Sequence, residues 1–243
     1  MLPLFQSLFF FLEGIPPMEA DAKTLGEIKL LSDIKLILNG RIPTDLVHKV
    51  FNHLKHNHQD GYDHYYLLDS LNVAKRLIDH QDNLTEHDVL LIYTIILLLE
   101  TGRPITKRHP YEVSPGVGWM FLRYYADGIF TPEDERFISQ SCRPIKADTI
   151  RMSSYTFVEL VIHTTKRLTD VVNQKYQKLY DEFAVLTGLP PCSKKLNKAF
   201  LEEYGPKGNL WDGFTTSTKD IFALEISNFK KKVGPFVDEL NVR

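Results

Sequence analysis

The sequence predicts an all-α protein, and three observations support this prediction. Apolar residues recur at the spacing of helix faces through most of the chain, and no segment alternates convincingly as a half-buried strand would. Residues that typically start and stop helices flank these periodic segments. The chain is 243 residues long, 43% hydrophobic and 25% charged, which is an ordinary composition for a globular protein with a substantial core.

We expect nine helical segments, with approximate bounds 21–38, 43–58, 64–80, 86–101, 116–127, 132–142, 154–186, 194–204 and 216–233. Pro43 opens the second segment, and Thr131 followed by Pro132 is a strong N-terminal signature with proline at the first helical position. Gly102 ends the most apolar helix, and Gly188 ends the long one.

The breaks between segments predict three parts of the chain. Residues 18–187 form a helical core, and residues 188–243 form a helical arm that we expect to pack on this core. Residues 1–17, "MLPLFQSLFFFLEGIPP", have no basic start and no small-residue cleavage site, and they are too short to span a bilayer. We interpret them as a non-native or flexible extension, with a membrane-surface anchor as the alternative, and leave open whether Met1 or Met18 is the native start.

Charge and cysteine content limit the classes of function. The formal net charge is −2 and the sequence pI is about 6.5, so no global basic field attracts nucleic acid or an anionic membrane, although a local basic patch is not excluded. The only cysteines, Cys142 and Cys192, are far apart, which excludes a zinc ribbon and a disulfide scaffold. We expect a cytoplasmic protein with no transmembrane segment.

Two histidine motifs are candidates for chemistry. The segment "HLKHNHQDGYDHYY" holds four histidines, and the i, i+3 spacing of His53 and His56 places them on one helix face. A metal site needs a convergent third ligand, so we interpret this segment as a histidine-rich helix end. The doublet His87-Asp88 follows Thr85, and we interpret it as a helix cap rather than a catalytic pair.

Three blocks of the sequence share an order and an apolar pattern with known helical motifs. They are "YYLLDSLNVAKRL" (Tyr65 to Leu77), "DVLLIYTIILLLETGR" (Asp88 to Arg103) and "FVELVIHTTKRLTDVV" (Phe157 to Val172). These blocks resemble, in this order, the patterns "GLLxHSLxVAxxA", "DLLxxAxLLHDIGK" and "LxxLxHxADxLDA" of the HD-domain superfamily of helical metal-dependent phosphohydrolases. The resemblance covers roughly residues 60–175. It implies an HD-domain-like helical bundle, here followed by a C-terminal helical arm.

The metal-binding positions of that family are changed in this chain. By the resemblance, the first histidine falls on Asp69, the His-Asp doublet on Leu99 and Glu100, and the late aspartate on Lys166. Leucine has no lone pair to donate, and lysine brings positive charge to a place for a divalent cation. We therefore expect a pseudo-site cluster of Asp69, Leu99, Glu100 and Lys166, in which the ammonium of Lys166 lies between the two acids and takes the place of the metal charge.

Three hypotheses about function remain open. The first is an HD-like protein with an eroded metal site that binds a nucleotide, a nucleic acid or a protein partner, with no cofactor. Its candidate phosphate-binding residues follow the apolar helix and are Arg103, Lys107, Arg108 and His109.

The second hypothesis is an active phosphohydrolase with an altered site for Mg²⁺ or Mn²⁺. Its candidate ligands are His64, Asp69, Glu100 and His109. The third hypothesis is an unrelated all-α interaction protein, whose resemblance to the family reflects only amphipathic periodicity. The sequence leaves the substrate or ligand, the oligomeric state and the biological process open.

Overall fold

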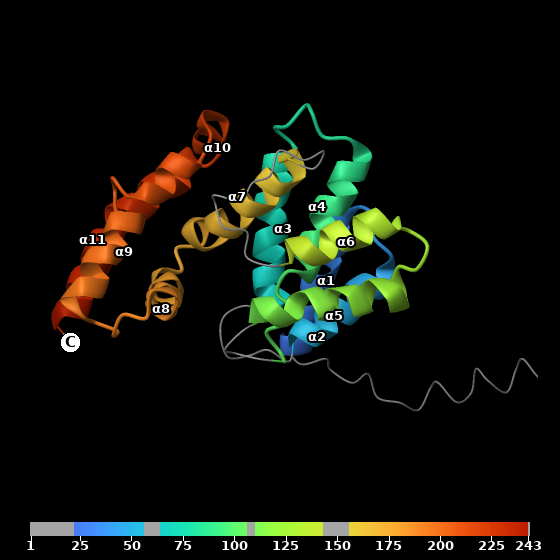
Figure 1. Cartoon of the computed structure of the whole chain (residues 1–243), viewed down its shortest axis with the longest axis horizontal. Coiled ribbons are helices and arrows are strands. Elements are labelled where there is room, and N and C mark those ends of the chain that lie inside the picture. The colour runs from blue at the N-terminus through green and yellow to red at the C-terminus, as the bar shows by residue number, and fades with distance from the viewer. Residues whose placement is uncertain (1–21, 56–63, 106–109, 143–155, 243) are drawn as a thin grey trace, which may run out of the picture.

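Helices make up all the regular secondary structure in the part of the chain that the computed structural model describes, which is residues 22–55, 64–105, 110–142 and 156–242. The all-α prediction is confirmed. The elements are α1 (Ala22–Leu38), α2 (Thr44–Lys55), α3 (His64–Ile78), α4 (Glu86–Leu98), α5 (Pro110–Tyr125), α6 (Pro132–Ser141), α7 (Thr156–Val172), α8 (Tyr176–Thr187), α9 (Lys194–Tyr204), the 3-10 turn η2 (Asn209–Gly213), α10 (Thr216–Ile221) and α11 (Ala223–Val242) (Figure 1).

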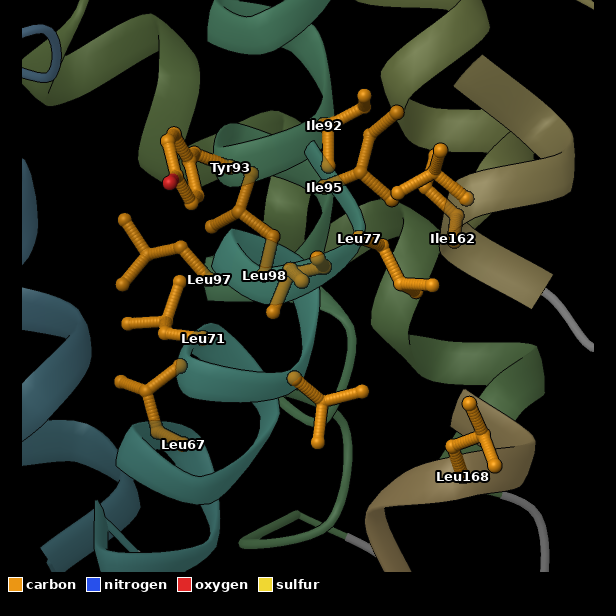
Figure 2. Close-up of a cluster of buried hydrophobic side chains, with 14 of the residues drawn as sticks. Leu67, Leu71, Leu77, Ile92, Tyr93, Ile95, Leu97, Leu98, Ile162 and Leu168 are labelled. Carbon is orange, nitrogen blue, oxygen red and sulfur yellow. The ribbon is translucent and has the colours of Figure 1, made fainter. Parts of the chain in front are cut away.

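Helix α4 lies in the centre of the core, packed against α3, α6 and α7. Its apolar side chains are buried around nearly the whole helix, which explains why its sequence shows an apolar run instead of a one-sided stripe. Figure 2 shows Ile92 and Ile95 of α4 among side chains of α3 and α7, including Leu77 and Ile162. Each fully buried aliphatic side chain of this kind contributes about 1.5–3 kcal/mol to folding.

The predicted helix ends are confirmed where they rest on specific side chains. The side-chain oxygens of Thr85 and Thr131 each accept a hydrogen bond from the backbone N–H three residues later. The carboxylate of the aspartate at that later position accepts a hydrogen bond from the backbone N–H of the threonine, so α4 and α6 both begin with a capping box. Pro132 occupies the first turn of α6. Gly188 ends α8 in the left-handed region, with φ of +66°, which glycine adopts without strain.

The prediction of a single helix over residues 154–186 is wrong. Its first two residues lie outside the described ranges, α7 ends at Val172, and α8 begins at Tyr176. Gln174 between them has a φ of +53°, and the backbone N–H of Lys175 donates to the carbonyl of Asp170 at 2.9 Å. The chain therefore turns between the two helices without a glycine or proline to mark the turn.

Two other predicted helices have different bounds. Helix α5 starts at Pro110 instead of 116 and accommodates Pro115 inside its second turn. The segment expected at 216–233 is divided at Phe222 into α10 and α11, and α11 continues through Pro235 to Val242. Pro115 lacks the backbone N–H that would bond to the carbonyl four residues earlier, so α5 continues through it with one helical hydrogen bond missing.

The C-terminal helices α9 to α11 lie at one end of the molecule (Figure 1), where α11 packs against α9 and α7 and α10 contacts α3. Arg76 of α3 donates to the Glu225 carboxylate and to the carbonyl of Ile221, at 2.6 Å each. Tyr180 of α8 donates its hydroxyl hydrogen to Asn197 of α9. These polar contacts fix how the arm is oriented on the core.

The helices of the described part of the chain lack the combination of length and apolar character that crossing a membrane requires.

Substitution of one α4 leucine should destabilise the fold strongly. Leu91 is 0% exposed, so Leu91→Ala should lower the free energy of unfolding by about 2–5 kcal/mol, because it removes buried methyl groups and leaves a cavity. The matched control is Leu36→Ala on α1, where the leucine is 79% exposed and the change should stay within about 0.5 kcal/mol. Urea unfolding followed by circular dichroism measures both, and equal losses would contradict the central position of α4.

Candidate functional site

The apolar helix α4 is followed by a tight turn that brings charged side chains into the interior. Successive backbone hydrogen bonds join Thr101 to Leu98 and Arg103 to Glu100, at 3.1 and 3.0 Å. The backbone N–H of Gly102 donates to the buried hydroxyl of Ser114 at 2.9 Å. This turn fixes the backbone at Glu100 and Arg103 and holds both residues against the core.

Glu100 and Arg103 form a buried ion pair. The Nε of Arg103 lies 2.6 Å from Oε2 of Glu100, and the two residues are 8% and 5% exposed. The same guanidinium reaches Glu182 of α8, with Nη2 at 2.9 Å from Oε1. One planar guanidinium therefore joins the end of α4 to α8 through two carboxylates, which is the geometry for which arginine is better suited than lysine.

Lys166 of α7 places its amine in the same buried region, where the Nζ atom has almost no solvent-accessible surface. Burial lowers the pKa of Lys166, while the negative charges of Glu100 and then Glu182 oppose that shift. Lys166 thus lies in the field of Glu100. Asp69, the second acid expected beside it, is not among the main charges that act on this amine.

Asp69 instead forms an ion pair with Lys175, whose Nζ lies 3.3 Å from its Oδ2. Next to it, Asp170 of α7 pairs with Lys178 of α8 at 2.6 Å, and both side chains are nearly fully buried. Burial raises the pKa of Asp170 to about 6 and lowers that of Lys178 to about 8, so desolvation outweighs the mutual attraction of the two groups. The Lys178 ammonium also lies 3.6 Å from the centre of the Tyr66 ring.

These contacts define an interior charge cluster with equal numbers of formal charges of each sign. Its members are Asp69, Glu100, Asp170, Glu182, Arg103, Lys166, Lys175 and Lys178. A divalent cation would have to displace Arg103 from Glu100 and would then lie near a buried lysine. Nowhere in the described residues do three or more His, Cys, Asp or Glu side chains gather as metal ligands. The residues around Glu100 do not fit a divalent metal.

The remaining candidate residues are dispersed. Leu99 is the C-cap of α4 and is buried. His64, a candidate ligand of the alternative metal site, is buried with its ring 5.0 Å from that of Phe51 and 4.5 Å from that of Tyr65. Lys107, Arg108 and His109, at positions 107–109, lie outside the described residues.

The two histidine motifs have structural contacts. A ring nitrogen of His53 lies 2.7 Å from the carbonyl oxygen of Thr101, so α2 supports the turn after α4. His56 is outside the described residues. His87 contacts the buried carboxylate of Asp134 at 3.0 Å and thereby joins α4 to α6.

Sequence reasoning missed four members of the interior charge cluster, namely Asp170, Lys175, Lys178 and Glu182. They lie on α7, at the N-cap of α8 and on α8, all within the segment that was expected to be one continuous helix. Nothing in their local sequence distinguishes them from solvent-facing charges of an amphipathic helix. They come together because the turn at Gln174 brings α8 back toward the end of α4, and no glycine or proline in the sequence indicates that turn.

Removing the charge of Glu100 should destabilise the protein, because Arg103 and Lys166 would keep buried positive charge without it. Glu100→Gln preserves the side-chain shape and should lower the free energy of unfolding by about 3 kcal/mol. Glu86→Gln is the control, since Glu86 pairs with Arg41 at the surface and its loss should cost less than about 1 kcal/mol. Equal stabilities of the two variants in urea unfolding would exclude a structural role for the buried pair.

The stability of the protein should depend on His163 in acid. Burial, with the positive charges of Arg167 and Lys166, lowers the pKa of His163 from 6.5 to about 4. The unfolded chain therefore takes up this proton before the folded chain does, so wild-type stability should fall as the pH drops from 6.5 to 4. His163→Gln lacks this effect and should gain stability relative to the wild type over that range.

Asp170 acts in the opposite direction over nearly the same range, since its raised pKa favours the folded state as the pH falls below about 6. Only the difference between the wild type and His163→Gln isolates the histidine. Urea unfolding at several pH values between 7 and 4 measures this difference, and a difference independent of pH would contradict the lowered pKa.

The candidate site therefore consists of ion pairs at the junction of α3, α4, α7 and α8. In comparisons with known proteins, the chain matches no family model, no curated protein and no solved structure.

Proposed function

We propose that this chain is an HD-domain-like protein that does not perform metal-dependent hydrolysis and acts by binding a protein partner. The motif resemblance supports the first part of the proposal. Its three blocks fall on α3, α4 with the following turn, and α7, and these elements pack against one another. Asp69 of α3, Glu100 in the turn after α4 and Lys166 of α7 thereby belong to adjacent elements, which is the arrangement that an eroded metal site requires.

The observation that carries the proposal is the ion pair between Glu100 and Arg103. A carboxylate that accepts a guanidinium at 2.6 Å in a buried place already has its charge compensated. The nearby amine of Lys166 adds further positive charge. A divalent cation in this region would be repelled by two cations of the chain, so water activation by a metal has no support from this arrangement.

The alternative of an active hydrolase requires an orientation of Lys166 that the contacts of this residue do not favour. It needs Lys166 to point away from the acids or to act on a bound phosphate. The Lys166 amine is instead buried in the field of Glu100 and Glu182. Arg103, one of the candidate phosphate-binding residues, is held by the same two carboxylates. A phosphate at Arg103 would have to compete with these two carboxylates for the guanidinium.

The solvent face of α5 supports a protein-binding role. Trp119, Met120 and Tyr124 are 45%, 53% and 74% exposed, and the guanidinium of Arg123 lies 5.5 Å from the centre of the Trp119 ring. The spacing of these residues places them on one continuous side of the helix. Tryptophan, tyrosine, methionine and arginine are the residue types enriched in protein interfaces relative to the rest of the surface.

Hydrolysis and metal dependence test the proposal directly. The purified protein, incubated with Mn²⁺ or Mg²⁺ and either nucleoside monophosphates or a generic phosphodiester, should release product no faster than Glu100→Gln does. Its thermal midpoint should be the same with and without EDTA, because no bound metal contributes to folding. Turnover that requires Mn²⁺ and is lost in Glu100→Gln would establish the hydrolase instead.

A further inference from the structure

A basic groove lies in the C-terminal arm, on a part of the protein that the interior charge cluster does not reach. The groove has a volume of about 560 Å³ and is open to solvent. Its walls come from the segment around η2, from α10 and from the first half of α11. A volume of this size accommodates a few side chains of a bound peptide or a small ligand.

Three lysines surround the groove. Lys219 comes from α10, and Lys230 and Lys231 come from α11, where they follow the lining residues Ala223 and Ser227 by one or two helical turns. No ion pair involving these lysines occurs within the described ranges. Burial and the repulsion of Lys219 lower the pKa of Lys230, while Asp212 opposes the shift. The groove therefore carries positive charge that carboxylates of the chain neutralise only to a small extent.

The floor of the groove is apolar. Pro206, Ala223 and Ile226 line it, so an aliphatic side chain of a ligand would be removed from water there. Trp211 also lines the groove but is only 4% exposed, and the Lys230 ammonium lies 4.6 Å from the centroid of its ring. The indole N–H donates to the carbonyl of Gly205, which holds the ring in place.

This combination distinguishes between two kinds of anionic partner. Single-stranded nucleic acid is held mainly by base stacking on exposed aromatic rings along a basic path. Here the indole is buried and its face is covered by an ammonium, so the groove presents no stacking surface. An acidic peptide needs separated positive charges and an apolar pocket for one side chain, and both are present. Charge complementarity therefore favours the peptide.

We propose that this groove binds an acidic peptide segment of a protein partner, with the peptide's carboxylates on Lys219, Lys230 and Lys231 and one of its aliphatic side chains on the apolar floor. The proposal names a partner class and a site that the hydrolysis assay does not address. Metal-dependent turnover would refute the non-catalytic role and leave the groove unaffected. Failure of peptide binding would refute the groove and leave the non-catalytic role unaffected.

Fluorescence polarisation with the full chain tests the proposal. The probe is a short fluorescein-labelled peptide that alternates glutamate with leucine, and the reference probe replaces each glutamate by glutamine. The acidic peptide should bind more tightly, and added salt should weaken it, because exposed charges are screened. The double variant Lys219→Glu/Lys231→Glu should bind it about tenfold more weakly, since two favourable contacts become repulsive.

Two further variants separate the site from net charge and the apolar floor from the lysines. Lys194→Glu/Lys195→Glu makes the same change in net charge at the exposed start of α9, outside the groove, and should bind the acidic peptide as the wild type does. Ala223→Trp fills the floor without changing charge and should also weaken binding about tenfold. Circular dichroism checks that all variants keep their helical content.

Several outcomes would overturn the proposal. Equal affinity for the acidic and glutamine peptides would show that charge does not contribute to binding. Equal losses of affinity in the two double variants would show that the peptide does not bind at the groove. Unchanged binding by Ala223→Trp would exclude the apolar floor. Tighter binding of an oligo-dT probe than of the acidic peptide, lost in Lys219→Glu/Lys231→Glu, would make the groove a nucleic-acid site instead.

Discussion

The ion pair between Glu100 and Arg103 is the interaction on which the arrangement of the interior depends. The apolar helix α4 passes through the core, and the turn that follows it places the carboxylate of Glu100 where solvent hardly reaches. A buried carboxylate is costly unless cations and hydrogen-bond donors surround it. Arg103 meets that need within the same turn and extends the contact to Glu182. The position of α8, and of the arm that packs beyond it, is therefore tied to the charge at the end of α4.

Much of the fold could be predicted because local side-chain chemistry determines the helix ends. Thr85, Thr131 and Gly188 act through contacts within a few residues of themselves, so the sequence around each is sufficient. The turn at Gln174 could not be predicted in this way. Its positive φ is supported by hydrogen bonds of flanking residues and by the packing of α8. Neither of these requires a glycine or proline, so the sequence contains no residue that indicates the turn. Such turns are decided by tertiary contacts.

The site was predictable only in part, for a related reason. Glu100 and Lys166 could be selected because the resemblance places both at metal-binding positions, on two helices that were expected to face each other. Which acid faces which base depends on side-chain direction and on α8, so the pairing of Asp69 with Lys175 was not visible in the sequence. The apolar packing around α4 is largely non-directional, whereas an ion pair requires defined geometry. The ion pairs consequently allow a smaller range of orientations of α8 relative to α4 than the packing of leucines does.

Lysines of this protein occur in two opposite electrostatic settings, and the contrast indicates where an external acid can bind. In the interior charge cluster, Lys175 and Lys178 each have a carboxylate of the same chain within ion-pairing distance. A further anion there would meet compensated charge and would have to displace an existing partner. Around the groove of the arm, Lys230 is subject to repulsion from Lys219, which the charge of Asp212 opposes. An incoming carboxylate relieves that repulsion without displacing an ion pair, so the gain in interaction energy is available at the groove and not in the interior.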